Sequence, residues 1–161
     1  MIIFSDAVHG VRINMSIRVY SEINLHVTWH TKNDTPLITA PMQPDLYAFL
    51  KNKIVTTRGA YFHAIGGTET HVHIAFSIKP SIHLDEWIGQ LKGASSFEMG
   101  KDLQWQAGYG IVSFGSRDLK WVVGYIHNQR EHHSKGTIHE RLERCEGSED
   151  EVCRGQRKPT S

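Results

Sequence analysis

The order of short periodic segments is the feature that most restricts the fold of this chain. Alternating apolar and polar residues predict strands, and apolar residues at three- and four-residue steps predict helices. The expected order is strand (15–30), helix (45–55), strand (60–65), strand (71–78), helix (81–91), strand (111–114) and a last helix (116–133). This order is typical of the ferredoxin-like (RRM-like) α+β fold. We therefore predict an antiparallel sheet with helices on one face and an additional C-terminal helix.

The length of 161 residues is that of one compact domain. We expect residues 15–145 to form this domain. Residues 1–14 show no clear periodicity, so they are either a leader or lie before a natural translation start at Met15. Residues 146–161 are polar and charged, which predicts a flexible tail.

Charge and composition exclude several classes of protein. The formal net charge is +1, so no global basic field attracts nucleic acid and any anion site must be local. No apolar run approaches the about 20 residues of a membrane-spanning helix, and the start does not resemble a signal peptide. Cys145 and Cys153 lack the spacing of a zinc knuckle. A cytoplasmic protein without a membrane partner is expected, and its 11 histidines direct attention to metal or proton chemistry.

His71-Val72-His73 lies inside an expected apolar strand. Side chains two apart in a strand point to the same side, so the two imidazoles project together. Two neutral imidazoles can supply half of the ligands of a divalent-metal site. An isolated pair of this kind is, however, more often an ordinary part of the surface or of the core packing. His26 and His30 also share a strand face, and we expect them to line the sheet.

Tyr125 and Gln129 are four residues apart in the last expected helix and therefore share one helical face. Such a pair is usually structural. Combined with His71 and His73, however, the Gln129 carbonyl offers a third metal ligand, and Tyr125 offers an oxygen nucleophile. The residues by themselves predict metal-dependent covalent catalysis by Tyr125.

Four further blocks stand in order along the chain around the His71-Val72-His73 strand: Val27 to Lys32, Gln90 to Ser96, Trp105 to Gly110, and Tyr125 to His133. Together these segments resemble the single-tyrosine HUH transposases of the bacterial insertion-sequence and REP-associated group. The resemblance covers roughly residues 16–143.

The resemblance implies a mechanism for single-stranded DNA with hairpins at the element ends. His71, His73 and Gln129 would hold Mg²⁺ or Mn²⁺, and Tyr125 would attack the scissile phosphate to give a 5′-phosphotyrosine and a free 3′-hydroxyl. The covalent link preserves the energy of the phosphodiester. A second 3′-hydroxyl can therefore rejoin it, and no nucleotide cofactor is needed.

The resemblance also implies a homodimer in which the tyrosine helix of one copy completes the metal site of the other. DNA contacts would come from local basic groups, and Lys32, Arg58 and Lys92 are the candidates. Solvated surface charge is an equally good interpretation of each of these three residues.

Three segments depart from the family pattern: Gly67 to Thr70 before the first histidine, the chain after Glu143, and residues 1–14. Two alternative functions remain open. One is a domesticated HUH nuclease that acts on repeats or replication origins with the same tyrosine chemistry. The other is a non-catalytic RRM-like module that binds nucleic acid through exposed aromatic residues of its sheet.

Overall fold

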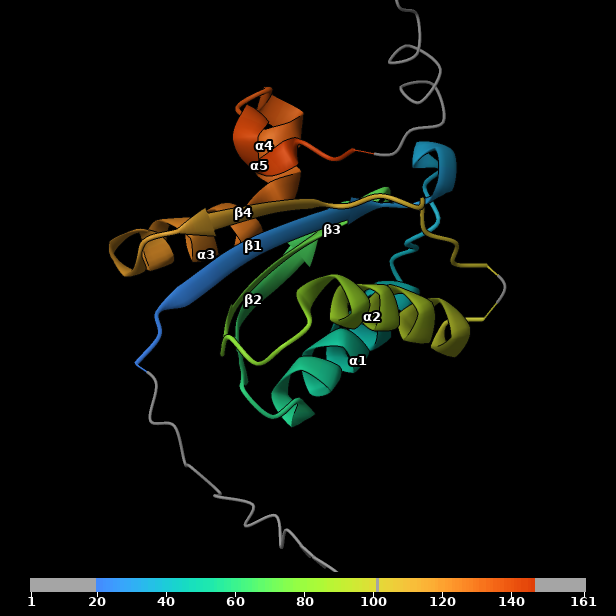
Figure 1. The fold of residues 1–161 in the computed structure, drawn as a ribbon. Coiled ribbons are helices and arrows are strands. Elements are labelled where there is room, and N and C mark those ends of the chain that lie inside the picture. Colours follow the sequence, from blue (N-terminus) through green and yellow to red (C-terminus); the bar gives the residue numbers. More distant parts are fainter. Residues whose placement is uncertain (1–19, 101, 147–161) are drawn as a thin grey trace, which may run out of the picture.

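The computed structural model describes residues 20–100 and 102–146, which contain a four-stranded antiparallel sheet (Figure 1). Its strands are β1 (Ile23–His30), β2 (Ala60–Gly67), β3 (His71–Ile78) and β4 (Gly110–Phe114), in the spatial order β2-β3-β1-β4. The first two helices are α1 (Met42–Thr56), between β1 and β2, and α2 (Leu84–Glu98), between β3 and β4. The predicted ferredoxin-like α+β fold is confirmed.

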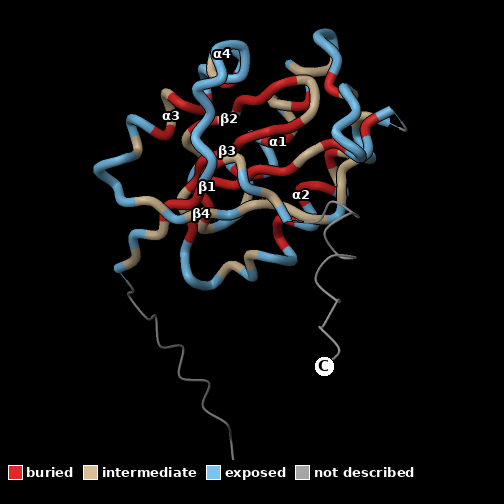
Figure 2. The backbone as a smooth tube through the Cα atoms, turned by 90° about the horizontal axis from the view of Figure 1, so that it is seen from above, coloured by how far each residue is buried: buried red, intermediate tan, exposed pale blue. Residues whose placement is uncertain are grey.

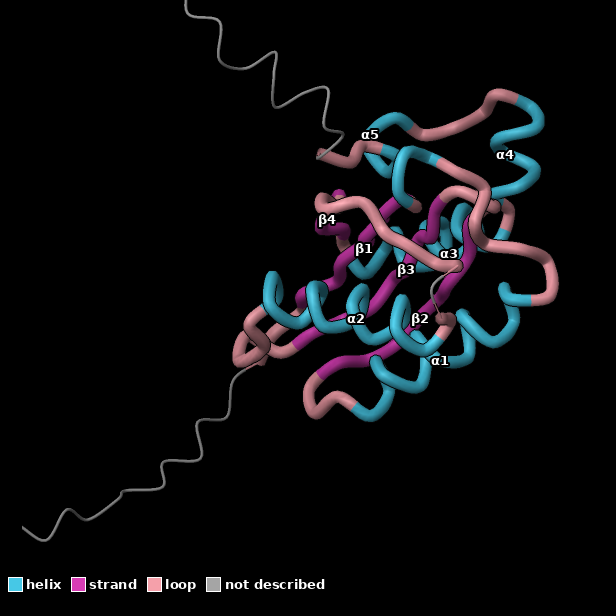
Figure 3. The backbone as a smooth tube through the Cα atoms, turned by 90° about the vertical axis from the view of Figure 1, so that its right-hand side faces the viewer, coloured by secondary structure: helices cyan, strands magenta, loops and turns pink. Residues whose placement is uncertain are grey.

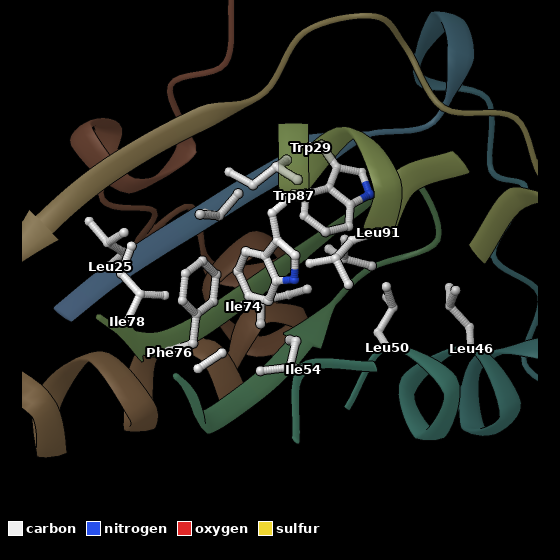
Figure 4. Close-up of a cluster of buried hydrophobic side chains, with 14 of the residues drawn as sticks. Leu25, Trp29, Leu46, Leu50, Ile54, Ile74, Phe76, Ile78, Trp87 and Leu91 are labelled. Carbon is white, nitrogen blue, oxygen red and sulfur yellow. The ribbon is translucent and has the colours of Figure 1, made fainter. Parts of the chain in front are cut away.

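The main core lies between the sheet and the helices α1 and α2 (Figure 4). Alternate residues of β1 and β3 face these helices, as expected for pleated strands. The apolar residues that fill this layer include Leu25, Val27, Trp29, Val72, Ile74 and Phe76 from the strands, and Leu46, Leu50, Ile54, Trp87, Ile88 and Leu91 from the helices. The other residues of β1 and β3 are also largely buried, so a second layer must cover the opposite face (Figure 2).

The C-terminal helices provide this second layer. They are α3 (Leu119–His127), α4 (Gln129–Lys135) and α5 (Glu140–Glu143), and they lie on the side of the sheet opposite to α1 and α2 (Figures 1 and 3). Val122 and Ile126 of α3 pack against Ala64 of β2 and Ala75 of β3. Because the alanine side chains are small, the helix axis can lie close to the strands.

The helix predicted over residues 116–133 is interrupted. A 3-10 turn (Ser116–Asp118) precedes α3, and Asn128 separates α3 from α4 with φ −101° and ψ 21°. The Asn128 side-chain amide donates a hydrogen bond of 2.9 Å to the Gly124 carbonyl. Such side-chain bonds compete with the helical pattern and explain the break. The short helix α5 was not predicted.

Several expected segments lie partly outside the described residues. The leader (1–14), residues 15–19 of the strand expected over 15–30, and residues 147–161 of the tail are not described. Residues 20–22 are described and precede the strand, which begins at Ile23, so the expected strand is too long at its start. Within the described ranges, no helix has both the length and the apolar character needed to cross a membrane.

Gly66 of β2 lies directly under α3. A Cβ atom at this position would be 2.1 Å from the backbone carbonyl oxygen of Ile126. The absence of a side chain at Gly66 is therefore what lets α3 contact the strand. Because Ile126 follows Tyr125, this contact also sets the height of Tyr125 above the sheet.

We predict that Gly66→Ala destabilises the folded chain by about 3 kcal/mol, since overpacking against backbone cannot be relieved by a side-chain rotation. Urea denaturation followed by circular dichroism measures the change. Gly89→Ala in α2 is the matched control, because a Cβ atom there meets nothing within 4 Å. The control should leave stability unchanged or raise it by helix propensity. Equal stability of the two variants would contradict the close approach of α3.

Candidate active site

Four histidines gather on the face of β1 and β3 that looks toward the C-terminal helices. The ring centroids of His71 and His73 are 4.9 Å apart. His30 stacks on His71 at 4.9 Å, and His26 lies 5.0 Å from His73. Antiparallel pairing explains the cluster, because His30 is directly opposite His71 in the ladder. The projection of His71 and His73 to one side therefore agrees with their spacing in the sequence.

The Nδ1 atoms of both central histidines have polar partners. Nδ1 of His71 lies 3.0 Å from the Thr68 hydroxyl and 3.1 Å from the Thr70 hydroxyl. Nδ1 of His73 lies 2.9 Å from Nε2 of His26. A hydrogen on each Nδ1 satisfies these contacts and leaves the Nε2 lone pair directed at the space below α3.

Burial keeps these imidazoles neutral. It lowers the pKa of His71 to about 3 and that of His26 to about 3, and it lowers the pKa of His73 as well. In each case burial is the largest cause, because a charged ring loses its hydration. Neutral imidazole is the form that binds a metal ion.

Tyr125 and Gln129 approach the histidines from above. The Tyr125 side chain is nearly buried, and its ring lies edge-on to His73 at a centroid distance of 6.1 Å. Oε1 of Gln129 is 3.4 Å from Nε2 of His71. The break at Asn128 does not separate the pair, since the Gln129 amide still donates to the Tyr125 backbone carbonyl at 3.5 Å. One chain thus brings together the four residues that the sequence singled out.

Glu143 of α5 is the residue that the sequence analysis missed. Its Oε2 atom lies 3.3 Å from Nε2 of His73, 3.8 Å from Nε2 of His71 and 3.5 Å from Nε2 of His133. Its other oxygen accepts a hydrogen bond from the Tyr125 hydroxyl. No periodic spacing relates Glu143 to the histidines, and its polar surroundings in the sequence are typical of an exposed segment.

Gly110 at the start of β4 permits this placement of Glu143. A Cβ atom on Gly110 would be 1.9 Å from the backbone carbonyl oxygen of Arg144. The end of α5 can therefore pass directly over β4. Leu142, which is buried, anchors the same helix.

The cluster has the properties of a divalent-metal site. His71, His73 and Glu143 each offer a ligand atom, and these atoms all lie within 4.8 Å of one another. Nε2 of His73 is buried and forms no well-aligned hydrogen bond in the described structure, although Oε2 of Glu143 lies 3.3 Å away. With the hydrogen on Nδ1, both atoms present lone pairs to each other, and a metal ion between them would be bound by both. Two imidazole nitrogens with carboxylate and carboxamide oxygens form a donor set that suits Mn²⁺ and accepts Mg²⁺.

The same contacts hold the Tyr125 hydroxyl in its protonated form. Burial, followed by the hydrogen bond to Glu143, raises the pKa of Tyr125 to about 12. For Glu143, burial alone would raise the pKa, but contacts with His73, Tyr125 and His71 outweigh it and hold the pKa below the ordinary value. The backbone N–H of His139 also donates to the Tyr125 oxygen at 3.0 Å, which fixes the position of this atom.

The three basic residues proposed for DNA contacts have different surroundings. The ammonium group of Lys92 is buried and donates to the backbone carbonyls of Gln106, Ala107 and Gly108 at 2.7 to 2.9 Å. These bonds use all three of its hydrogens and hold the loop before β4. Lys32 is exposed just beyond the β1 end that carries His30, whereas Arg58 is exposed before β2, at the other end of the sheet.

A family comparison agrees with this geometry. Residues 19–129 match the sequence profile of the family described as "Transposase IS200 like". The match includes His71, His73, Tyr125 and Gln129 but ends before Glu143. The family match identifies a transposase. The chain belongs to the IS200-like transposase family.

Solved structures share the fold. A candidate transposase from Deinococcus radiodurans R1 is 22% identical, with a TM-score of 0.55 over 70% of this chain and 95% of that chain. A REP-associated tyrosine transposase bound to a REP hairpin is 15% identical, with a TM-score of 0.54 over 75% of this chain and 74% of that chain. No curated protein matches the sequence.

We predict that His26→Ala weakens Mn²⁺ binding about 10- to 100-fold, because the ring of His73 loses the partner that orients it. His26→Gln, which restores a hydrogen-bond acceptor, should recover part of the loss. Isothermal titration calorimetry measures the affinity. Glu143→Ala, which removes a candidate ligand, should weaken binding at least as strongly.

His63→Ala is the matched control for this prediction. His63 is a histidine of β2 that contacts Ser77 and lies outside the cluster. This variant should bind Mn²⁺ as the unmodified chain does. A folded His26→Ala variant with unchanged affinity would show that His26 does not orient His73.

Proposed function

We propose that the chain cleaves and rejoins single-stranded DNA at hairpin-bearing element ends through a 5′-phosphotyrosine intermediate. The observation that carries this proposal is the convergence of the Tyr125 hydroxyl, two neutral imidazoles and Glu143 at one point below α3. A buried phenol beside a candidate metal site suits nucleophilic attack on phosphorus. Membership of a transposase family supports DNA as the substrate.

In the cleavage step, the Tyr125 oxygen bonds to phosphorus as the bond from phosphorus to the 3′-oxygen breaks. The phenolic proton must leave during the attack. Contacts hold the pKa of the Glu143 carboxyl low and that of Tyr125 high, so the proton passes along the existing hydrogen bond to Glu143 only as the Tyr125 oxygen bonds to phosphorus and the phenol becomes acidic. The departing 3′-oxygen takes up a proton from water and becomes a hydroxyl, and Glu143 returns its proton to solvent. In rejoining, a 3′-hydroxyl attacks the phosphotyrosine and Tyr125 recovers its proton, so no nucleotide cofactor is consumed.

His71, His73 and Gln129 would hold the divalent ion, with Glu143 as an additional ligand. A bound Mg²⁺ or Mn²⁺ would act as a Lewis acid and stabilise charge on the scissile phosphate. The Thr68 and Thr70 hydroxyls and the His26 ring would keep both histidines oriented toward it. This arrangement is organised before substrate binds, which favours electrostatic stabilisation.

A DNA hairpin is the proposed partner because the REP-associated transposase of similar fold was solved with a REP hairpin. Lys32 is the best placed of the basic candidates for a phosphate contact near the site, and Arg58 would be reached only by DNA that extends along the sheet. A DNA-processing role also suits the cytoplasmic location expected from the sequence.

Two alternatives make different predictions. A domesticated nuclease would use Tyr125 in the same way but would release cleaved DNA without transferring it to a second strand. An RRM-like binding module would need an open sheet face for stacking. In the described structure the corresponding face of β1 and β3 carries buried histidines under the C-terminal helices, which favours the catalytic proposal.

We expect a labelled hairpin oligonucleotide with a single-stranded flank to form a covalent protein–DNA adduct in the presence of Mn²⁺. Denaturing gel electrophoresis detects the adduct. Tyr125→Phe should abolish it while retaining hairpin binding, because only the nucleophilic oxygen is removed. His71→Ala should lose the adduct but keep binding. An adduct that persists in Tyr125→Phe would refute the assigned nucleophile.

We also propose a homodimer with exchanged tyrosine helices. In the described chain, Tyr125 lies beside the histidines of its own copy. Exchange of α3 between two copies of the chain would reproduce the same contacts across a symmetric interface, because the interacting surfaces are identical. The single-chain geometry is thus compatible with either arrangement.

Complementation distinguishes the two arrangements. Inactive Tyr125→Phe and His71→Ala chains should recover adduct formation after they are mixed and allowed to exchange subunits. A mixed dimer with exchanged helices contains one site with intact histidines and an intact tyrosine. The same dimer without exchange contains none. Mixing that restores no adduct, with subunit exchange verified, would show that each copy uses its own tyrosine.

A further inference from the structure

A cavity of about 350 Å³ lies beside the nucleophile, on the flank of α3 away from the main core. We call it the Trp121 pocket. Its lining includes Trp121, Gly124 and Tyr125 of α3, His132 of α4, and Ile138 and His139 of the segment before α5. Its volume is within the range of pockets that hold small planar ligands.

Four of the eight lining residues carry aromatic rings. Trp121 stacks on Tyr125 with centroids 5.7 Å apart and an interplanar angle of 18°. His132 stacks on Tyr125 at 4.7 Å, and His139 lies edge-on to Trp121 at 5.3 Å. The nucleophilic ring therefore belongs to a continuous aromatic surface.

Trp121 lies on the side of α3 that faces away from the sheet. It is 51% exposed, whereas Val122 and Ile126 of the same helix are buried against the sheet. A single exposed apolar side chain is common on protein surfaces and needs no explanation by itself. The open part of Trp121 differs from such cases because it lines a cavity and stacks on the ring of the proposed nucleophile.

We propose that the Trp121 pocket binds the unpaired nucleobase of a nucleotide joined to the phosphate that Tyr125 attacks. The proposal rests on the proposed function and names a substrate contact within it. The Tyr125 ring forms part of the pocket. When a phosphate of the DNA lies at the Tyr125 hydroxyl, the bases of the nucleotides on either side of it are therefore close to the pocket. Stacking on aromatic rings suits unpaired bases of any sequence, because every base has a π-face.

The charge of the pocket suits a nucleotide. None of its lining residues is acidic in the described structure, and the His132 and His139 side chains are either neutral or positive. A phosphodiester that enters with its base therefore meets no repulsive carboxylate along this wall. Glu143 is not among the lining residues, although its carboxylate accepts a hydrogen bond from the hydroxyl of Tyr125, which is one of them.

Gly124 provides an independent way to test the pocket. A Cβ atom at this position meets nothing within 4 Å. A larger side chain can therefore enter the pocket without disturbing the helix, and replacing glycine in a helix favours helix formation. Gly124→Leu fills the space, whereas Trp121→Ala removes the stacking surface. Both changes should have the same effect on DNA binding for different physical reasons.

The experiment measures binding of a hairpin oligonucleotide with a single-stranded flank to full-length protein by fluorescence anisotropy. Tyr125→Phe serves as the background, so that no cleavage occurs. Trp121→Ala should weaken binding about 5- to 150-fold, the equivalent of one lost stacking contact. Gly124→Leu should weaken it similarly, and Trp121→Phe should retain most of the affinity. Phe97→Ala, at a highly exposed aromatic residue of α2, should change nothing.

Oligonucleotides with an abasic site on either side of the scissile phosphate provide the decisive comparison. At one of the two positions, the loss caused by Trp121→Ala should disappear, because the stacking partner is already absent. An equal loss on intact and both abasic substrates would overturn the proposal, since Trp121 would then act only through the position of the neighbouring ring. Unchanged binding in Trp121→Ala would overturn it as well.

These outcomes differ from failure of the proposed function. If the unmodified chain forms no adduct, phosphotyrosine chemistry is refuted, but a base-dependent effect of Trp121 would still establish the pocket. If the adduct forms and Trp121→Ala lowers the affinity equally for intact and abasic oligonucleotides, only the base-binding role of the pocket is refuted.

Discussion

The pleat of β1 and β3 is the constraint on which the rest of the structure depends. Each central strand must supply apolar side chains to the core on one face and polar side chains to the site on the other. Trp29 and Val72 belong to the core, while their neighbours in the sequence, His30 and His71, face the C-terminal helices. A slip of one residue would exchange the two sets, so burial of the core also fixes the position of the histidines.

Small residues on the sheet then decide how closely the second layer approaches. Gly66 and the alanines at positions 64 and 75 let α3 lie against β2 and β3, and Gly110 lets the end of α5 pass over β4. The site consequently combines two kinds of support. Rigid strands hold the two imidazoles, and the glycines at positions 66 and 110 set how close the helices lie to the sheet. Precise placement of Tyr125 and Glu143 follows from backbone contacts rather than from charge attraction alone.

Local periodicity was sufficient to predict much of the site. The two-residue step placed His71 and His73 on one side of a strand, and the four-residue step placed Tyr125 and Gln129 on one face of a helix. The sheet and the order of its elements also followed from pattern. The family profile supports the transposase assignment, and the roles of individual residues remain proposals.

Contacts between distant segments could not be predicted in this way. His26 was expected only to line the sheet, but strand pairing brings it within 2.9 Å of His73. Glu143 reaches the site through the packing of a four-residue helix that no period reveals. The interruption at Asn128 depends on one side-chain hydrogen bond, which overrides an otherwise helical pattern. Tertiary packing decided each of these features.

The order of the elements along the chain has a consequence for biosynthesis. In the described structure all four strands precede α5, so the residues of the sheet and its histidine pair are synthesised before Glu143. The carboxylate of Glu143 is the last group of the site to leave the ribosome. An incomplete polypeptide therefore carries the imidazoles without their acidic neighbour, and the full set of charges around the phenol exists only after the ribosome has passed residue 143.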